Sequence, residues 1–385
     1  MTSITNPSAA SPSPVPAEDK LRVLVVDDSL IYRKVVRDAL ATLPHVEVVG
    51  SAANGRVAIE KIEQFSPDMV TLDFEMPELD GLGVLKWLRQ SQRPTKAVML
   101  SALTIEGGEA TVQALHEGAF DFVVKPSGKD AKQNQRDLES ALLQQVDALH
   151  TLITGKRRRS TAVRNVPAAP PATPPSSSSV ATNRPAAGTH RIGVVAIGVS
   201  TGGPDALRTM LPMLPGDFPV PIVIVQHMPP VFTKSLAESL NKICSLEVSE
   251  AVEYQIVKPG HVAIAPGGKQ LKLLKTSTGL PQVKLTDDPP VQSCRPSVDY
   301  MLFSLAESFG DQTLSVIMTG MGYDGAEGSR RLHALGGPVI AQNEATCVVY
   351  GMPRKPIEEG YADVVAPLKS IAAEISRYAG RAARG

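Results

Sequence analysis

Residues 194–211, VVAIGVSTGGPDALRTML, combine an apolar run, a glycine-rich segment and the start of a helical pattern. The continuous aliphatic run is typical of a parallel strand that is buried on both faces. Pro204 suits a first helical position, and the glycines allow a tight turn between strand and helix. Ser200 lies in that turn within a G-x-S-x-G pattern, which exposes a serine hydroxyl at the edge of a sheet. The stretch therefore predicts an α/β fold with a candidate nucleophile.

Two other interpretations of this turn remain open. The glycines could cradle a phosphate, but a P-loop needs a lysine after its last glycine and none follows Gly203. A dinucleotide site needs G-x-G-x-x-G, and the spacing here differs. Ser200 could also be only a helix N-cap.

The alternation of strands and helices continues on both sides of this stretch. Residues 191–380 carry the strand-like runs RIGVVAIG, PVPIVIVQ, HVAIAP, LSVIMTG and PVIAQ, with LKLLKT and QVKLT as a hairpin. Residues 20–149 carry LRVLVVDD, VEVVGSA, DMVTLDF, KAVMLSA and DFVVKP. The chain is therefore expected to form two doubly wound, mostly parallel-sheet domains, a five-stranded one and a larger one with a hairpin.

Two segments have the composition of disordered chain. Residues 1–19 lack the apolar core of a secretory signal and are expected to be a disordered tail. Residues 150–190 are rich in Pro, Ser and Ala and are expected to be a disordered linker. Its basic start could touch an acidic partner, although a solvated linker is favoured.

Composition excludes several classes of protein. Lys+Arg and Asp+Glu both total 39, so no net charge favours nucleic acid or anionic lipid. No apolar run approaches the roughly 20 residues of a membrane span, so no membrane insertion is expected. The 3 cysteines are far apart, which fits a reducing compartment. A cytoplasmic protein is expected.

Acidic residues follow two of the strands predicted for residues 20–149. Asp27 and Asp28 follow the first strand and Asp73 ends the third, while Ser101 and Lys125 follow the fourth and fifth. In a parallel sheet these ends share one edge, where ligands bind. Clustered carboxylates favour a hard cation such as Mg²⁺, and one of them could accept a phosphoryl group. Each acid alone could be only a cap or loop residue.

These residues resemble the response-regulator receiver domain. VLVVDDS, DMVTLDFEMPELDG, VMLSA and GAFDFVVKP stand in family order between residue 21 and about residue 145. The resemblance implies that Asp73 is the phosphoacceptor and that a sensor histidine kinase is the phosphodonor. It implies a Mg²⁺ site and a set of switch residues. The Mg²⁺ ligands would be Asp28, Asp73 and the Glu75 backbone, with Asp27 acting through water; the switch residues would be Ser101, Phe122 and Lys125.

Partners for Ser200 are predicted at the ends of two other strands. His227 follows PIVIVQ, and Asp324 follows LSVIMTGMGY. A serine needs a base, and a base needs an orienting group. Alone, His227 could be a loop histidine, and Asp324 could be the cap of a D-x-x-E pattern. The order Ser, His, Asp differs from that of an α/β-hydrolase, so a lipase-type fold is not expected. The glycine-rich TGMGYDG offers amides for an oxyanion hole.

The second domain resembles the chemotaxis protein-glutamate methylesterase (CheB) family. IGVSTGGP, VQHMPPVFT, VAIAPGG, CRPSVDYMLFS, MTGMGYDGAEG and AQNEATCVVYGMPR carry this resemblance over residues 191–368. It implies a serine hydrolase with Ser200 as nucleophile, His227 as base and acid, and Asp324 as the orienting group. Met321 would donate to the oxyanion and Thr201 would support the histidine. No cofactor is implied in this domain.

The resemblance also implies the substrate. Glutamate methyl esters on the cytoplasmic helices of chemoreceptors would be hydrolysed to methanol and glutamate during adaptation, and receptor glutamines deamidated. Two residues depart from the family pattern: Tyr323 stands where Asn is usual, and Cys294 where His is often found. Both departures bear on substrate preference.

Two other functions compete with this one. A receiver joined to a DNA-binding output domain should be basic, yet residues 191–385 contain 18 Lys or Arg and 18 Asp or Glu. A receiver joined to a nucleotide-binding module would use the loop at 198–203. Labelling of Ser200 by a fluorophosphonate would separate the esterase from both.

Overall fold

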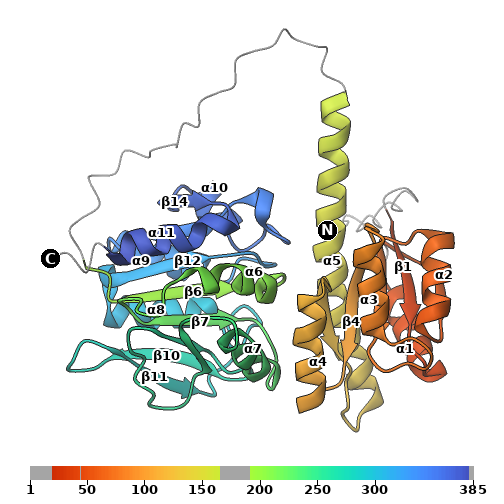
Figure 1. Cartoon of the computed structure of the whole chain (residues 1–385), viewed down its shortest axis with the longest axis horizontal. Coiled ribbons are helices and arrows are strands. Elements are labelled where there is room, and N and C mark those ends of the chain that lie inside the picture. The colour runs from red at the N-terminus through yellow and green to blue at the C-terminus, as the bar shows by residue number, and fades with distance from the viewer. Residues whose placement is uncertain (1–19, 44, 165–190, 381–385) are drawn as a thin grey trace, which may run out of the picture. The chain divides into compact units, whose positions relative to one another are not determined.

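The computed structural model describes residues 20–43, 45–164 and 191–380. Each half of the chain forms a parallel β-sheet whose strands are connected mainly through helices (Figure 1). The predicted fold class, two parallel-sheet α/β domains, is confirmed. The predicted tail and residues 165–190 of the predicted linker lie outside the described residues.

The N-terminal sheet has five strands in the order β2-β1-β3-β4-β5. All five predicted strands are present, and β1 pairs in parallel with both β2 and β3. The strand order reverses at β1, so the carboxyl ends of β1 and β3 border the crevice where such sheets bind ligands. The strands are β1 (Leu21–Val26), β2 (Val46–Ala52), β3 (Met69–Asp73), β4 (Lys96–Ser101) and β5 (Asp121–Val124).

Five helices accompany this sheet. Four of them follow N-cap residues whose side chains accept a backbone N–H of the first turn: Ser29, Asn54, Asp80 and Thr104. The last helix continues to Arg164, so the start expected for the linker, residue 150, falls inside a helix. The helices are α1 (Leu30–Ala41), α2 (Gly55–Phe65), α3 (Gly81–Gln90), α4 (Ile105–His116) and α5 (Ala131–Arg164).

The C-terminal sheet has seven strands in the order β14-β13-β12-β6-β7-β9-β8, all parallel. The predicted hairpin is present as an antiparallel pair, β10 and β11. The two edge strands, β8 and β14, were not predicted. The strands are β6 (Val194–Val199), β7 (Ile222–Gln226), β8 (Glu247–Glu250), β9 (His261–Ile264), β10 (Gln270–Lys275), β11 (Pro281–Thr286), β12 (Thr313–Ile317), β13 (Val339–Gln342) and β14 (Val364–Ala366).

Helix α8 and the hairpin pack against this sheet through a continuous hydrophobic core. Leu271 and Val283 of the hairpin, Met301 and Leu305 of α8, and Val223 of the sheet are all fully buried in it. Burying each such side chain contributes about 1.5–3 kcal/mol, which fixes α8 on the sheet. The helices are α6 (Gly203–Met210), α7 (Phe232–Asn241), α8 (Val298–Ser308), α9 (Ala326–Ala334), α10 (Arg354–Glu358) and α11 (Leu368–Gly380), with short 3₁₀ turns at Leu211–Met213, Gly310–Gln312 and Glu344–Thr346.

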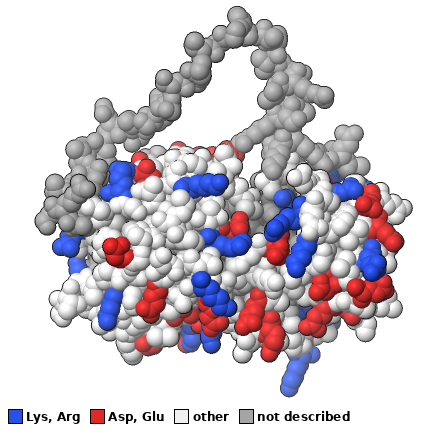
Figure 2. Space-filling view, in the orientation of Figure 1, with Lys and Arg blue, Asp and Glu red and all other residues white. Residues whose placement is uncertain are grey.

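Charges of both signs are interspersed over the surface visible in Figure 2. Among the described residues, no helix is both long enough and apolar enough to cross a membrane.

Candidate functional site

Ser200 lies in the turn between β6 and α6, at the carboxyl end of a central strand. Its N–H donates to Thr319 O (3.0 Å), and its carbonyl accepts from Gly203 N–H (2.7 Å), which closes the turn. Gly202 has a left-handed φ of 76°, and a Cβ there would lie 2.5 Å from Val348 Cβ. Gly202, not Ser200, is the N-cap of α6, so the interpretation of Ser200 as a cap is wrong.

His227 and Asp324 lie at the ends of the two strands that flank β6. His227 directly follows β7, and Asp324 lies between β12 and α9. His227 Nε2 is 2.8 Å from Asp324 Oδ2, and the His227 N–H donates to Val199 O (3.1 Å). The parallel order β12-β6-β7 therefore brings all three predicted residues to one edge of the sheet, as Figure 1 shows for the strands themselves.

Asp324 is held by the N-terminus of α8. Its Oδ1 accepts from Ser297 Oγ (2.9 Å) and Asp299 N–H (2.9 Å), and its Oδ2 accepts from Val298 N–H (2.7 Å). The first backbone amides of a helix favour a negative charge beside them. Helix α9 begins at Ala326 with Gly325 as its N-cap, so the interpretation of Asp324 as a helix cap is wrong.

The environment of this pair shifts both pKa values. Burial lowers the pKa of His227, but its hydrogen bonds with Asp324 and Cys294 outweigh burial and raise it above 6.5. Burial raises the pKa of Asp324, but the hydrogen bond to His227 and the amides of α8 bring it below 3.8. The pair therefore stabilises the imidazolium form, which a general base must adopt during turnover.

The second nitrogen of the His227 ring faces Cys294. Cys294 Sγ is 3.7 Å from His227 Nδ1, and Nε2 is already bonded to Asp324. Nδ1 is therefore the nitrogen that remains to accept a proton from a nucleophile. Within the described residues, Ser200 Oγ forms no hydrogen bond, so the contact expected between Ser200 and the His227 ring is not closed here. Such contacts are often long before substrate binds.

A tight loop, residues 291–294, presents Cys294 at this point. Val291 and Cys294 exchange two backbone hydrogen bonds (3.1 and 2.9 Å). The two residues between them, Gln292 and Ser293, have positive φ values of 49° and 63°. Gln292 Nε2 also donates to Asp299 Oδ2 (2.6 Å), which ties the loop to α8. The backbone that carries the thiol is therefore held in place.

The predicted oxyanion loop lies beside Ser200. A Cβ built on Gly320 would be 2.7 Å from Ser200 Cβ, so the loop passes very close to Ser200 at Gly320. Met321 is the next residue of the loop. The Met321 N–H has no acceptor among the described residues. Tyr323 is 56% exposed. Thr201 is buried, and its carbonyl accepts from Thr319 Oγ1 (3.0 Å); among the described residues, no hydrogen bond joins its side chain to His227.

Three residues of the site were not predicted. Gln226 Nε2 donates to the carbonyls of Ser200 (3.0 Å) and His227 (3.3 Å) and so ties two of the strand ends together. Thr319 ties the Ser200 turn to β12, and Ser297 binds Asp324. All three lie within the sequence motifs that carry the family resemblance, but the spacing of residues in those motifs does not indicate what these three side chains do.

The N-terminal sheet carries a separate cluster of acids. Oxygen atoms of Asp27, Asp28 and Asp73 all lie within 4.8 Å of one another. Asp27 and Asp73 are buried, and Asp27 Oδ1 accepts from Ser29 N–H (2.9 Å). Converging carboxylates at this spacing provide the hard oxygen ligands that Mg²⁺ prefers. The predicted cluster is therefore present, and its residues fit this ion.

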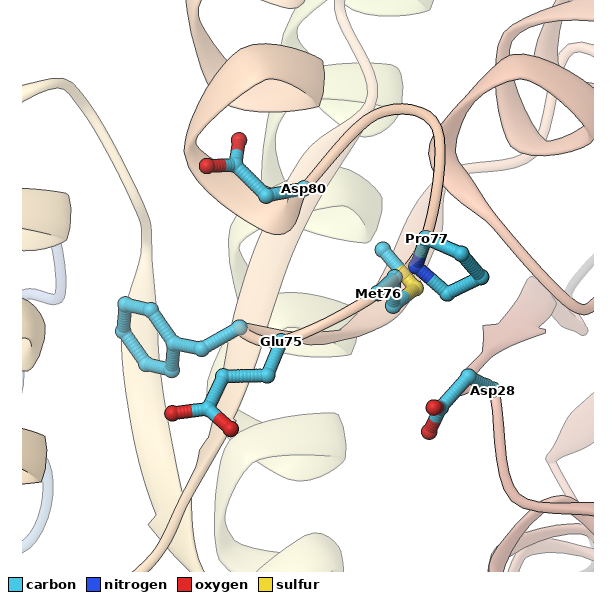
Figure 3. A pocket seen from close by; sticks show the side chains of 6 residues that line it. Asp28, Glu75, Met76, Pro77 and Asp80 are labelled. Carbon is cyan, nitrogen blue, oxygen red and sulfur yellow. The ribbon is translucent and has the colours of Figure 1, made fainter.

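A pocket of ≈ 450 Å³ opens beside this cluster and is lined by Asp28, Phe74, Glu75, Met76, Pro77 and Asp80. Figure 3 shows the Glu75 carboxylate and the Asp28 carboxylate on opposite sides of it. The Glu75 side chain therefore points away from Asp28, which leaves its backbone as the group expected to bind a cation.

The predicted switch residues lie at the end of β4, within β5 and directly after β5. Lys125 N–H donates to Ser101 O (2.7 Å), so the ends of these strands are adjacent. The Ser101 hydroxyl accepts from Thr111 Oγ1 (2.7 Å) on α4 and is buried. Phe122 lies within β5. Thr111, which was not predicted, therefore holds the Ser101 hydroxyl in its present direction.

Comparisons with known proteins agree with the family resemblance of each half of the chain. The family described as "CheB methylesterase" matches residues 195–375, and "Response regulator receiver domain" matches residues 23–134. The chain is 46% identical over 356 residues to a protein-glutamate methylesterase/protein-glutamine glutaminase of Desulfotalea psychrophila, covering 92% of this chain and 97% of that protein. It is 42% identical to one of Geobacter sulfurreducens, covering 94% and 98%.

A solved structure is also similar. The Thermotoga maritima CheB methylesterase catalytic domain is 46% identical, and the match covers 49% of this chain and 99% of that one with a TM-score of 0.47. The similarity to the two full-length relatives extends over both sheets and over the strand ends that carry Ser200, His227 and Asp324. The chain therefore belongs to the CheB family of protein-glutamate methylesterases, with a response regulator receiver domain at its N-terminus.

Proposed function

We propose that this chain is a phosphorylation-regulated serine hydrolase that removes methyl groups from glutamate methyl esters of chemoreceptors and also deamidates receptor glutamines. Methanol is released in the first reaction and ammonia in the second. The observation that carries the proposal is the His227–Asp324 pair, joined at 2.8 Å beside the Ser200 turn. The segments after three adjacent parallel strands supply these groups, and a triad requires that its three members meet in space. The enzyme would act in the cytoplasm, on the cytoplasmic helices of the receptors.

The reaction uses Ser200 as the nucleophile. Ser200 Oγ attacks the ester carbonyl while His227 Nδ1 takes its proton, and Asp324 holds the Nε2–H of the same ring. The Met321 N–H binds the oxyanion, and Thr201 supports the histidine ring through the turn. His227 then protonates the departing methoxy group, which leaves as methanol. Water hydrolyses the acyl-enzyme with His227 again as base, and glutamate is restored. These steps use no metal ion.

The receiver half regulates this reaction. Asp73 accepts a phosphoryl group from a histidine of a sensor kinase, so that the P–N bond of the donor breaks and a P–O bond to Asp73 forms. Mg²⁺ would neutralise the crowded carboxylates and the phosphoryl oxygens, held by Asp28, Asp73 and the Glu75 carbonyl, with Asp27 acting through water. Lys125 pairs with the new charge, Ser101 turns from Thr111 toward a phosphoryl oxygen, and Phe122 responds to that change.

The domain boundaries are part of the same proposal. We assign 20–149 to the receiver domain, 150–190 to the linker and 191–380 to the catalytic domain. Because α5 runs to Arg164, the first part of that linker is helical. Phosphorylation of Asp73 is expected to release an inhibited state, so a phosphodonor should raise the rate of the full-length protein.

Methanol release from methylated chemoreceptors tests the catalytic assignment. Ser200→Ala should abolish release and labelling by a fluorophosphonate, while Ser245→Ala, an exposed serine of the same domain, should keep both. Turnover by Ser200→Ala near that of the wild type would refute the assignment.

A small acyl phosphate with Mg²⁺ tests the receiver assignment. It should phosphorylate the wild type and stimulate methanol release, and Asp73→Asn should lose both responses but keep its basal rate. Phosphorylation that persists in Asp73→Asn would place the acceptor at another residue.

A further inference from the structure

We propose that Cys294 Sγ and His227 Nδ1 form a binding site for Zn²⁺, and that Zn²⁺ bound there inhibits the enzyme. The two atoms belong to different segments, residue 294 before α8 and residue 227 after β7, yet they lie 3.7 Å apart. A nitrogen and a thiolate sulfur are ligands that zinc prefers. This site is separate from the carboxylate cluster of the receiver. It shares His227 with the function proposed above, and the predicted inhibition rests on that function, whereas metal binding does not.

The separation of the two atoms fits a zinc ion without rearrangement. Zinc binds a histidine nitrogen at about 2.0–2.1 Å and a thiolate at about 2.3 Å, which at a tetrahedral angle places the two ligands about 3.5 Å apart. The observed 3.7 Å requires only a slightly wider angle. The ring also has the correct nitrogen available, because Nε2 is bonded to Asp324 and Nδ1 is directed at the sulfur.

The surroundings of the histidine match those of a zinc ligand. A metal-binding histidine almost always donates its other ring N–H to a carboxylate, a backbone carbonyl or a water, which fixes the ring and raises its basicity. Asp324 accepts this hydrogen bond and is itself held by three donors from Ser297, Val298 and Asp299. The catalytic pair is therefore already arranged like the outer shell of a zinc site.

The thiol is held in place by its own loop. The paired backbone hydrogen bonds between Val291 and Cys294 fix the start of that segment, and Gln270 Nε2 donates to Cys294 O (3.2 Å). Cys294 is half-buried, and the His227 side chain is 14% exposed, so a cation can reach both. A preformed pair of ligands loses little conformational entropy when the ion binds.

The types of the two ligands determine which ion should bind and what its binding should do. A thiolate and an imidazole favour Zn²⁺ over Mg²⁺, whereas the three receiver carboxylates favour Mg²⁺. Binding releases the thiol proton, and the Nδ1 proton of any imidazolium, to water, and the ion then occupies the lone pair of Nδ1. His227 can then no longer accept the proton of Ser200. Two protein ligands leave two positions for water, so the ion should exchange and act as a reversible inhibitor.

Metal binding and inhibition can be measured on the full-length protein with Mg²⁺ in excess, so that the receiver carboxylates are occupied. Wild-type protein should bind Co²⁺ with a thiolate charge-transfer band, and Zn²⁺ should remove that band. Zn²⁺ should also inhibit methanol release, with recovery after chelation. Cys294→Ser should lose the band and need at least about tenfold more Zn²⁺ for the same inhibition.

Two further variants make the result specific. Cys244→Ser, at a half-buried cysteine between α7 and β8, should behave like the wild type. Cys294→His should keep inhibition by Zn²⁺ but lose the thiolate band, because imidazole replaces the sulfur. If Cys294→Ser binds Co²⁺ and is inhibited by Zn²⁺ as the wild type is, the proposed site is wrong. The Co²⁺ band needs no esterase activity, so this failure is distinguishable from failure of the proposed function.

Discussion

Replacing Asp324 by Asn should damage the catalytic domain in two measurable ways. The carboxylate accepts four hydrogen bonds, from His227 Nε2, Ser297 Oγ and the N–H groups of Val298 and Asp299. An amide has one oxygen and one NH₂ group. In either orientation, the NH₂ group faces one of the two N–H groups of α8 and leaves it without an acceptor.

The size of both effects follows from these contacts. A buried donor without an acceptor costs about 1–3 kcal/mol, and the lost charge at a helix N-terminus about 0.3–2 kcal/mol, so unfolding should become easier by about 2–4 kcal/mol. In one of the two orientations, the NH₂ group takes the place of Oδ2, which leaves the Val298 N–H without an acceptor. The NH₂ group then donates to His227 Nε2, so Nε2 must be unprotonated and the ring proton lies on Nδ1. A base in the wrong tautomer should lower kcat on the order of 10³–10⁴.

Urea unfolding and the rate of methanol release measure the two effects on the same protein. Asp287→Asn is the matched control, because Asp287 is an exposed acid of the same domain that pairs with Lys269 at 2.7 Å. It should change neither quantity appreciably. A kcat of Asp324→Asn within about threefold of the wild type would refute the orienting role of this residue. An unchanged free energy of unfolding would refute the reasoning about α8.

Three more results are expected. Gly320→Ala should lower kcat by at least about tenfold in methanol-release assays without removing a reactive group, because its Cβ would lie 2.7 Å from Ser200 Cβ and displace the turn; an unchanged rate would show that the turn adapts. Ser297→Ala should cost about 1–2 kcal/mol in urea unfolding, since it removes an α8 cap that also binds Asp324; no loss would contradict this. Burial raises the pKa of Asp299 from 3.8 to about 7, so its folded form holds a proton that the unfolded chain releases, and stability should fall as pH rises from 4 to 7. Asp299→Asn should remove up to about 4 kcal/mol of that fall, as measured by unfolding at several pH values; an equally steep profile would contradict the assignment.

The sequence predicts the central strands well and the edges poorly. Strands β6, β7 and β12 are buried on both faces, so their aliphatic runs are continuous and easy to recognise. Strands β8 and β14 are short edge strands with exposed or half-buried residues, and EVSE and VVA carry no comparable pattern. Helix α5 extends past the expected boundary. Its Lys- and Arg-rich end resembles a linker in composition, so the boundary was expected too early, but Lys and Arg are also good helix formers.

The candidate site was predictable only in part, for a similar reason. Ser200, His227 and Asp324 each end a recognisable strand or follow one closely, so topology alone brings them together. The residues that hold them do not share that property. Ser297 reaches Asp324 from the N-cap of α8, a helix that packs against the sheet, and its contact depends on that packing rather than on any spacing in the chain.

The position of the site within the seven-stranded sheet has a consequence for how the enzyme loses activity. Local opening of a protein begins where few contacts hold the backbone, and here those places are β8 and β14, three strands and two strands away from the central β6–β12 pair respectively. The amides of β6, β7 and β12 should therefore be the slowest of this sheet to exchange with solvent. Heating should fray both edges while the serine turn, the histidine and the acid stay in register. Thermal inactivation should then coincide with global unfolding of the catalytic domain instead of preceding it.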